Sequence, residues 1–289
     1  MPKKRLIGGL IMREGWIVQS IGFSRYLPVG RPEIAARFLN DWGVDEILLL
    51  DIGATARGEL IDPEIVARVS SSCYVPLAVG GGIKSAADVR ALIRAGADKV
   101  VINTAAVLAP ECLFDVVHMF GSQCIIAAMD IRRTIEGHDT VINGGRQFLG
   151  KNPVTMARAL AGAGAGEILL HSVDYDGSKQ GYDLAVIDDV STAVNLPVIA
   201  MGGAGHPEHV REVLSRDSVS AAAVGNMLHF SEHSVAVIKQ YLAAHNIDIR
   251  QDAEARYVHV EIDKDGRVAK LPDDILAHAV FEFIAEEVI

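Results

Sequence analysis

Short runs of apolar residues recur at regular intervals along the chain, and longer amphipathic stretches separate them. The runs are rich in Val, Ile, Leu and Ala without strict alternation, which is typical of parallel β-strands covered on both faces. Eight of these runs are predicted strands: residues 6–12, 46–51, 75–79, 99–103, 124–130, 167–171, 197–201 and 220–224.

The stretches between the runs carry apolar residues at helical spacing, after residues that suit a helix N-cap. The clearest predicted helices cover residues 32–42, 85–95, 152–163 and 207–214. Strands that alternate with helices form parallel sheets, and eight such units favour closure of the sheet. The pattern therefore predicts a (β/α)8 barrel, the TIM barrel of the α/β class.

An internal repeat supports the barrel. VDEILLLD (44–51) matches AGEILLHS (165–172) at an offset of 121 residues. The same offset relates VPLAVGGGIKSAADVRALI (75–93) to LPVIAMGGAGHPEHVREVL (196–214). Chance likeness between apolar strands would not give one offset for two blocks. The repeat therefore predicts two duplicated half-barrels of four βα units each.

The last part of the chain lies outside this repeat, so we predict a barrel over residues 1–250 and a C-terminal extension over 251–289. Residues 256–270 alternate in polarity around a DKDG turn and predict a β-hairpin. Residues 272–289 predict a helix with acidic residues in its first turn. The extension could be a packing appendage, a cap on one barrel end or an oligomer contact.

Composition narrows the class of protein. Half of the 289 residues are hydrophobic, which is enough for a large buried core. The net charge of −10 argues against nucleic acid as a partner. We identify no signal peptide or membrane segment. The odd cysteine number without CxxC spacing indicates reduced thiols in a cytoplasmic protein: Cys73, Cys112 and Cys124.

Two histidine pairs have helical spacing, but neither has a third ligand nearby in the sequence. They are His206 with His209, and His229 with His233. A metal site needs more ligands than this, so we expect no metal, and nothing in the sequence indicates a cofactor.

Function in such barrels lies at the carboxyl ends of the strands. Glycine-rich loops follow the third and seventh predicted strands, where backbone N–H groups can approach an anion. Tight packing could explain one such loop, but two loops related by the repeat suggest a ligand with two phosphate groups. The candidate phosphate ligands are Gly81, Gly82, Asn103, Thr104, Asp176, Gly177, Gly202, Gly203, Gly225 and Asn226.

Two aspartates close apolar strands at the same end of the barrel. Asp130 ends the fifth predicted strand, where burial would favour a raised pKa and a role as general acid or base. Asp51 ends the second strand in the same manner. Either residue could instead pin a loop, and for Asp51 this alternative has nearly equal weight.

Charged residues stand at or near four strand starts, which form the opposite face of the barrel. Two are cations and two are anions: Arg5, Glu46, Lys99 and Glu167. They predict a ring of salt bridges around the barrel mouth. Such a ring could be only a structural plug, because the lower face of these barrels usually serves stability.

Several motifs together resemble the HisF family, the cyclase subunit of imidazole glycerol phosphate synthase. They are PLAVGGGI, RAGADKVVINTAAV, FGSQCIIAAMD, GAGEILL, DYDGSKQGYD and PVIAMGGAG, and the likeness runs from about residue 4 to 250. The resemblance implies a glutaminase docked on the lower face, ammonia passing the charged ring, and a substrate with two phosphates. It also implies two aspartates as acid and base, and it places Asp98 and Gln123 toward the docking face.

The resemblance breaks at the substrate end. The position of the second family aspartate is Ile11, the family's loop lysine aligns with Gln19, and His171 and Met201 replace other polar residues. The resemblance therefore predicts a paralog that works with a glutaminase on another phosphorylated acceptor, such as an activated sugar amidated for surface polysaccharide. Two alternatives stay open. One is a true cyclase with a displaced acid (Asp51, Asp174 or Asp176), and the other a barrel that only stimulates a glutaminase.

Overall fold

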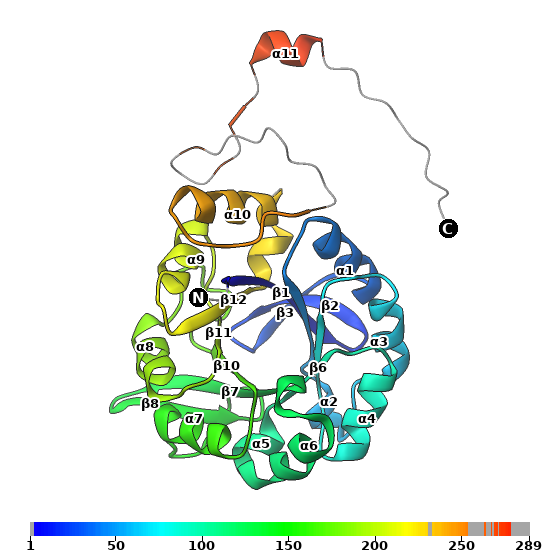
Figure 1. Cartoon of the computed structure of the whole chain (residues 1–289), viewed down its shortest axis with the longest axis vertical. Coiled ribbons are helices and arrows are strands. Elements are labelled where there is room, and N and C mark those ends of the chain that lie inside the picture. The colour runs from blue at the N-terminus through cyan, green and yellow to red at the C-terminus, as the bar shows by residue number, and fades with distance from the viewer. Residues whose placement is uncertain are drawn as a thin grey trace.

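The computed structural model describes residues 3–230, 233–253, 263, 267, 269–270 and 272–278. Within them, eight parallel strands form a closed barrel, which Figure 1 shows along its axis. The β7–β10 pairing closes the ring, and the two half-barrels meet at the β6–β7 and β12–β1 pairs. All eight predicted strands are confirmed: β1 (Arg5–Arg13), β4 (Glu46–Asp51), β5 (Leu77–Gly80), β6 (Lys99–Ile102), β7 (Ile125–Thr134), β10 (Glu167–Ser172), β11 (Val198–Met201) and β12 (Val219–Val224).

Helices surround the barrel on its outside (Figure 1). The four predicted helices are confirmed as α1 (Pro32–Asp41), α4 (Ala86–Arg94), α7 (Pro153–Gly162) and α9 (Pro207–Leu214). Ser85 begins α4 with a capping box to Asp88. The further helices are α2 (Ala54–Arg57), α3 (Pro63–Ser70), α5 (Thr104–Leu108), α6 (Leu113–Phe120), α8 (Leu184–Ala193), α10 (Ser234–Ala244) and α11 (Asp273–Ala277).

Two separate hydrophobic cores follow from the alternation of side chains along each strand. The larger core lies between strands and helices and includes Leu10, Met129 and Leu170. The smaller core fills the barrel interior, and it takes the intervening residues of the strands. Its members are Ile7, Ile11, Val18, Leu48, Ala78, Val101, Ile126, Ala128, Leu169, Ile199, Met201, Ala221 and Ala223.

Two antiparallel additions at the carboxyl end of the barrel were not predicted from the sequence. The hairpin of β2 (Trp16–Ile21) and β3 (Arg25–Gly30) continues from the end of β1. Strand β7 runs beyond its predicted end because it pairs there with β8 (Gly137–Ile142), which pairs in turn with β9 (Gln147–Phe148). Both additions extend the wall of the barrel on the side where we expect the functional site.

Most of the predicted C-terminal hairpin lies outside the described residues. Within it, the Asp263 N–H donates to the Arg267 carbonyl at 2.8 Å, and the Arg267 N–H donates to Asp263 Oδ1 at 2.9 Å. The predicted helix over 272–289 is described only as α11. The two-part division of the chain therefore stays a prediction. No helix among the described residues has the length and apolar character needed to cross a membrane.

Candidate functional site at the carboxyl ends of the barrel strands

Asp130 points into the barrel, because it follows the interior residue Ala128 by two positions on β7. Asn103 Nδ2 donates to Asp130 Oδ2 at 3.0 Å. Asp130 Oδ1 lies 4.0 Å from His171 Nδ1 on the neighbouring strand β10. Burial raises the pKa of Asp130, and the contacts with His171 and Asn103 oppose this rise without cancelling it. The predicted acid–base residue thus has a polar setting inside the barrel.

His171 lies between two carboxylates. Its Nε2 atom is 3.7 Å from Asp176 Oδ1, on the side of the ring away from Asp130. The ring of Phe23 meets the imidazole edge to face, with a centroid distance of 4.8 Å. Within the described residues the buried Nε2 atom makes no hydrogen bond. Sequence reasoning noted His171 only as a departure from the family pattern, although a histidine that closes an apolar strand is itself a signal.

Asp176 holds the tip of the β2–β3 hairpin. Its Oδ2 atom accepts hydrogen bonds from Ser20 Oγ at 2.6 Å and from the Phe23 N–H at 3.3 Å. Asn226 binds the same hairpin, since it accepts from the Ser20 N–H at 3.1 Å and donates to the Ser20 carbonyl at 2.6 Å. Two residues predicted as phosphate ligands are therefore brought together, and their side chains make these hydrogen bonds with the hairpin.

The wall opposite Asp130 is apolar. Strand β1 lies four strands from β7 in either direction around the barrel. Its Ile11 side chain is 5% exposed and belongs to the interior core together with Met201. A Cβ at Gly9 would lie 3.3 Å from Met201 Cε, so the thioether side chain reaches over β1 toward this glycine. Hydrocarbon and thioether groups thus stand where the resemblance places a second carboxylate.

Asp51 has the contacts of a residue that pins a loop. It follows Leu50 on β4 and turns away from the interior. Its Oδ1 atom accepts from the N–H groups of Gly53 at 2.9 Å and Ala54 at 3.2 Å, and Arg57 Nη2 donates to Oδ2 at 2.7 Å. These contacts favour the structural alternative, and the predicted acid–base role of Asp51 stays untested.

The two glycine loops adopt matching backbone conformations in the two half-barrels. Gly82 and Gly203 have φ angles of +69° and +105°. A Cβ at Gly82 would lie 1.7 Å from the Glu59 carbonyl oxygen, and one at Gly203 would lie 1.8 Å from that of Gly181. Both glycines are therefore required by close backbone approach. This packing explains the glycines without excluding an anion.

Backbone N–H groups in these two loops are available to an anion. The N–H groups of Gly82, Ile83, Gly203 and Ala204 make no hydrogen bond to the part of the chain that the structure describes. The following turns match as well. A short helical turn follows β6, and another follows β12. The residue before each turn has nearly the same backbone conformation, with φ and ψ of −107° and −91° at Asn103 and of −110° and −96° at Gly225. Phosphate binding by the full predicted set (Gly81, Gly82, Asn103, Thr104, Asp176, Gly177, Gly202, Gly203, Gly225 and Asn226) stays a prediction.

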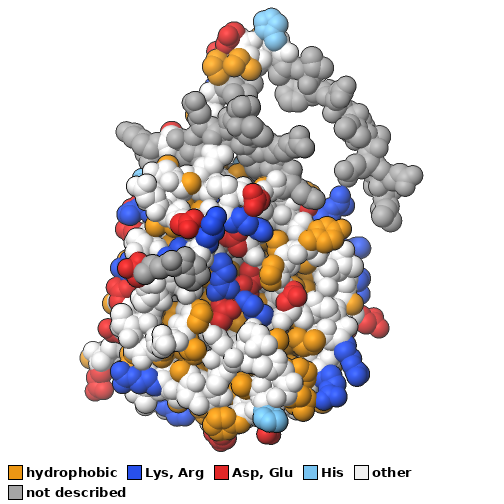
Figure 2. All heavy atoms as spheres, viewed as in Figure 1, with side chains coloured by type: hydrophobic (Ala, Val, Ile, Leu, Met, Phe, Trp, Pro, Cys, Tyr) orange, Lys and Arg blue, Asp and Glu red, His pale blue; other side chains and the backbone are white. Residues whose placement is uncertain are grey.

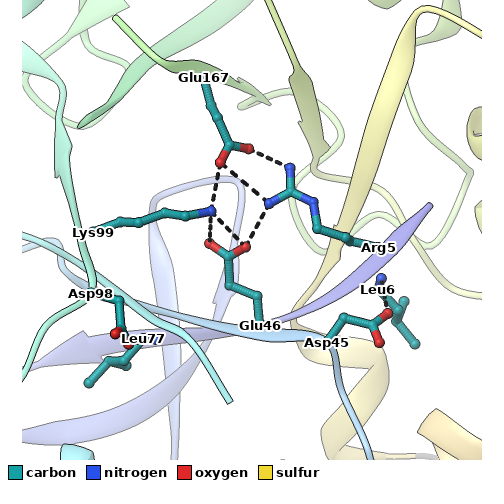
Figure 3. A network of polar contacts seen from close by, with 8 residues as sticks. All are labelled: Arg5, Leu6, Asp45, Glu46, Leu77, Asp98, Lys99 and Glu167. Atoms are coloured by element: carbon teal, nitrogen blue, oxygen red, sulfur yellow. Dashed lines mark hydrogen bonds and ion pairs between the residues drawn. The ribbon is translucent and has the colours of Figure 1, made fainter. Parts of the chain in front are cut away.

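The charged residues at the amino ends of the strands form a closed ring (Figure 3). Glu46 Oε2 accepts from Arg5 Nη1 at 2.7 Å and from Lys99 Nζ at 3.0 Å. Glu167 completes the ring, since it accepts from Lys99 Nζ at 2.6 Å and pairs with Arg5 Nη2. The predicted salt-bridge ring is thus present, with each carboxylate held by both cations. A role of this ring as an ammonia gate stays a prediction.

Glu167 makes the ring sensitive to acid. Burial alone would raise the pKa of Glu167, but the hydrogen bonds and charges of Arg5 and Lys99 outweigh it and hold the pKa below the ordinary 4.5. Its stabilising contribution is therefore complete above that value and is lost as the pH falls through the lower folded-state pKa. We expect the urea midpoint to fall between pH 5 and 3, and to fall less in Glu167→Gln, as measured by circular dichroism. Equal slopes for the two proteins would contradict this assignment.

A family model described as histidine biosynthesis protein matches residues 5–234. The chain belongs to this histidine biosynthesis family. Among its relatives, three proteins of Bacillus cereus are named imidazole glycerol phosphate synthase subunit HisF. Those of strains Q1 and AH187 are 42% identical to this chain and that of strain ATCC 10987 is 41% identical, each over 251 residues. These alignments cover 86% of this chain and 100% of each relative. The HisF-like resemblance of the sequence is thereby confirmed.

The predicted docking residues of this HisF-like barrel lie on one face. Asp98 and Gln123 are both exposed and precede the neighbouring strands β6 and β7 at their amino ends. Asp98 Oδ2 also accepts from the Leu77 N–H at 2.8 Å, which fixes the start of β5. Figure 2 shows acidic and basic side chains gathered over the middle of the face seen along the barrel axis. A partner contact at these residues stays a prediction.

The remaining side chains considered for chemistry are cysteines and histidines. The three cysteines are free thiols, and burial raises the pKa of Cys73 to about 11. His206 Nδ1 accepts from the Glu208 N–H and caps α9, while His209 Nδ1 accepts from the Gly205 N–H. Among the described residues, no group of three or more metal-binding side chains comes together.

Proposed function

We propose that this chain is the ammonia-using synthase subunit of a two-protein enzyme. A glutaminase docks on the face that carries Asp98 and Gln123, and its ammonia enters the barrel through the Arg5–Glu46–Lys99–Glu167 ring. The ammonia reacts at the other end with a phosphorylated small molecule held by the two glycine loops, and Asp130 exchanges the proton. The ring, the matched loops and the buried carboxyl of Asp130 each support one part of this proposal.

The acceptor we propose is not the histidine-pathway substrate but another phosphorylated compound, such as a nucleotide-activated sugar that is amidated for surface polysaccharide. The observation that carries this proposal is the apolar side chain of Ile11 across the barrel from Asp130, with Met201 Cε reaching toward neighbouring Gly9. General acid–base catalysis needs a group that can hold and release a proton, and neither side chain can do so. Closure of an imidazole ring by two opposed carboxyls is therefore not available to this barrel.

A second candidate function is that of the named relatives, imidazole glycerol phosphate synthase, because the identity of 42% extends over their whole length. It requires a displaced acid. Asp174 accepts from Arg132 Nε at 2.9 Å and from the Arg133 N–H at 2.7 Å, so its carboxylate is engaged outside the barrel. Asp176 lies beside His171, on the same wall as Asp130 rather than opposite it.

Complementation of a cyclase-deficient histidine auxotroph separates the two functions. The chain, expressed with its own glutaminase, is expected not to restore growth. Ile11→Asp returns a carboxyl to the wall opposite Asp130, so the purified variant is expected to turn over the histidine-pathway substrate at least about tenfold faster than the wild type. Ile11→Asn is the matched control, because it has the same size and polarity but no exchangeable carboxyl proton.

Growth of the auxotroph on the wild-type chain would overturn the proposed acceptor and establish the second candidate. Ammonia-dependent product from nucleotide sugars, with the purified chain and glutaminase, would support the proposal directly. Stimulation of the glutaminase without any product in either assay would show the third possibility, a non-catalytic barrel.

A further inference from the structure

The acid–base groups of the site follow one another along a single wall. Asp130 on β7, His171 on β10 and Asp176 in the following loop succeed one another, with separations of 4.0 Å and 3.7 Å through the imidazole. Register places His171 directly beside Asp130 in the parallel β7–β10 pair. His171 therefore cannot replace a carboxyl on β1, across the barrel, and its position needs a different explanation.

The position of His171 can be explained by its electrostatic effect on the buried carboxyl of Asp130. A carboxyl inside a barrel resists ionisation, because burial disfavours its charged form. A cation next to it reverses that effect, and a doubly protonated imidazole beside Asp130 is such a cation. A second carboxylate on the far side of the same ring stabilises the imidazolium in turn. Asp130, His171 and Asp176 are arranged in this way, with the imidazole between the two carboxyl groups.

We propose that His171 is a positioning residue that allows the buried Asp130 to change charge, so that all proton transfer occurs on the β7–β10 wall. This inference rests on the proposed function and deepens it. When Asp130 donates, its O–H bond breaks, the proton forms a bond to the acceptor molecule, and the electron pair stays on the carboxylate beside His171. Donation and return of the proton then use one group rather than two opposed ones.

The groups around the imidazole agree with this role. Asp130 faces it from β7 and Asp176 from the loop after β10. Phe23 of the hairpin is uncharged, and its ring packs edge to face against the imidazole. Tyr26 on β3 is within electrostatic range of Asp176, and burial raises the pKa of this phenol, so it stays neutral. Asp130 and Asp176 are therefore the charged groups that these described contacts bring against the imidazole.

The arrangement also limits the acceptor. An acceptor in this barrel must present the atom that exchanges a proton to Asp130 and His171. Its opposite edge meets Ile11 on β1, where an ionised or strongly hydrogen-bonding group would lose its water without compensation. We therefore expect a phosphorylated molecule with one reactive edge and an apolar edge turned toward β1.

Carboxyl ¹³C NMR of the full-length protein, labelled at aspartate and free of substrate, tests the role of His171. Asp130→Asn assigns the Asp130 signal. His171→Phe keeps an aromatic ring against Phe23 but removes both nitrogens. We expect it to lower the acid dissociation constant of Asp130 by about tenfold or more, which moves its titration to higher pH.

His138→Phe is the matched control. His138 Nε2 lies 2.9 Å from Asp183 and not beside Asp130, so its replacement should leave the Asp130 titration unchanged. His171→Gln repeats the measurement if the phenylalanine variant does not fold. An Asp130 titration that is the same in wild type and the His171 variants would overturn the proposal and leave His171 a packing residue. Because no substrate is added, this result is independent of which acceptor the enzyme uses.

Discussion

Asp130→Asn is expected to lower ammonia-dependent product formation by about 100- to 10,000-fold, the range in which general acid–base groups contribute. Asn keeps the shape of the side chain and can still bond to Asn103, but it has no proton that it can give and take. The strand across the barrel offers no substitute, because Ile11 occupies the matching place on β1. Because Asp130 alone donates the proton and takes it back in our proposal, the loss is expected to be larger than it would be with a second acid.

The rate is measured with ammonium salt in place of glutamine, so that neither the glutaminase nor the ring limits it, and with nucleotide sugars as acceptors. Asp139→Asn is the control. This carboxylate is also buried, and it accepts from the N–H groups of Gly150 and Lys151 at 2.9 and 2.7 Å. Unchanged output from Asp130→Asn would show that the barrel itself is not catalytic. An equally large loss in Asp51→Asn would instead confirm Asp51 as a second acid–base residue.

Glu46→Gln is expected to lower the free energy of unfolding by about 3 kcal/mol, the low end of what removal of one partner from a buried ion pair costs. Glu46 is 2% exposed and binds both Arg5 and Lys99. Without its charge, the two cations share Glu167 alone and repel each other inside the barrel mouth. The partial exposure of Arg5 and Lys99 allows some screening, which keeps the effect from being larger.

Urea unfolding at pH 7 measures this effect, and Glu59→Gln is the control. Glu59 pairs with Arg57 on the surface, so its loss is expected to cost less than about 1 kcal/mol. The ratio of glutamine-dependent to ammonium-dependent turnover adds a functional measurement. If the ring gates ammonia, Glu46→Gln changes this ratio, whereas a plain structural plug changes stability only. A stability loss as small as that of Glu59→Gln would contradict the ring's energetic role.

The sequence by itself determined the barrel, because each βα unit carries its own local signals. Apolar runs such as residues 167–171 predict buried strands without any knowledge of their neighbours. Residues at strand starts must meet around one mouth once eight strands close, so the ring of Arg5, Glu46, Lys99 and Glu167 followed from position alone. The repeat likewise placed the two glycine loops in equivalent positions.

Only the tertiary structure decided how the site is arranged. The β2–β3 and β7–β8 hairpins depend on antiparallel pairing between residues of mixed polarity, which periodicity does not signal. Asp51 and Asp130 both close apolar strands, yet side-chain alternation turns Asp130 into the barrel and Asp51 out toward Arg57. His171 acquired a role only when strand pairing set it beside Asp130 and a loop brought Asp176 to its other side. Chemistry here depends on distances between strands, and these are set when the sheet closes.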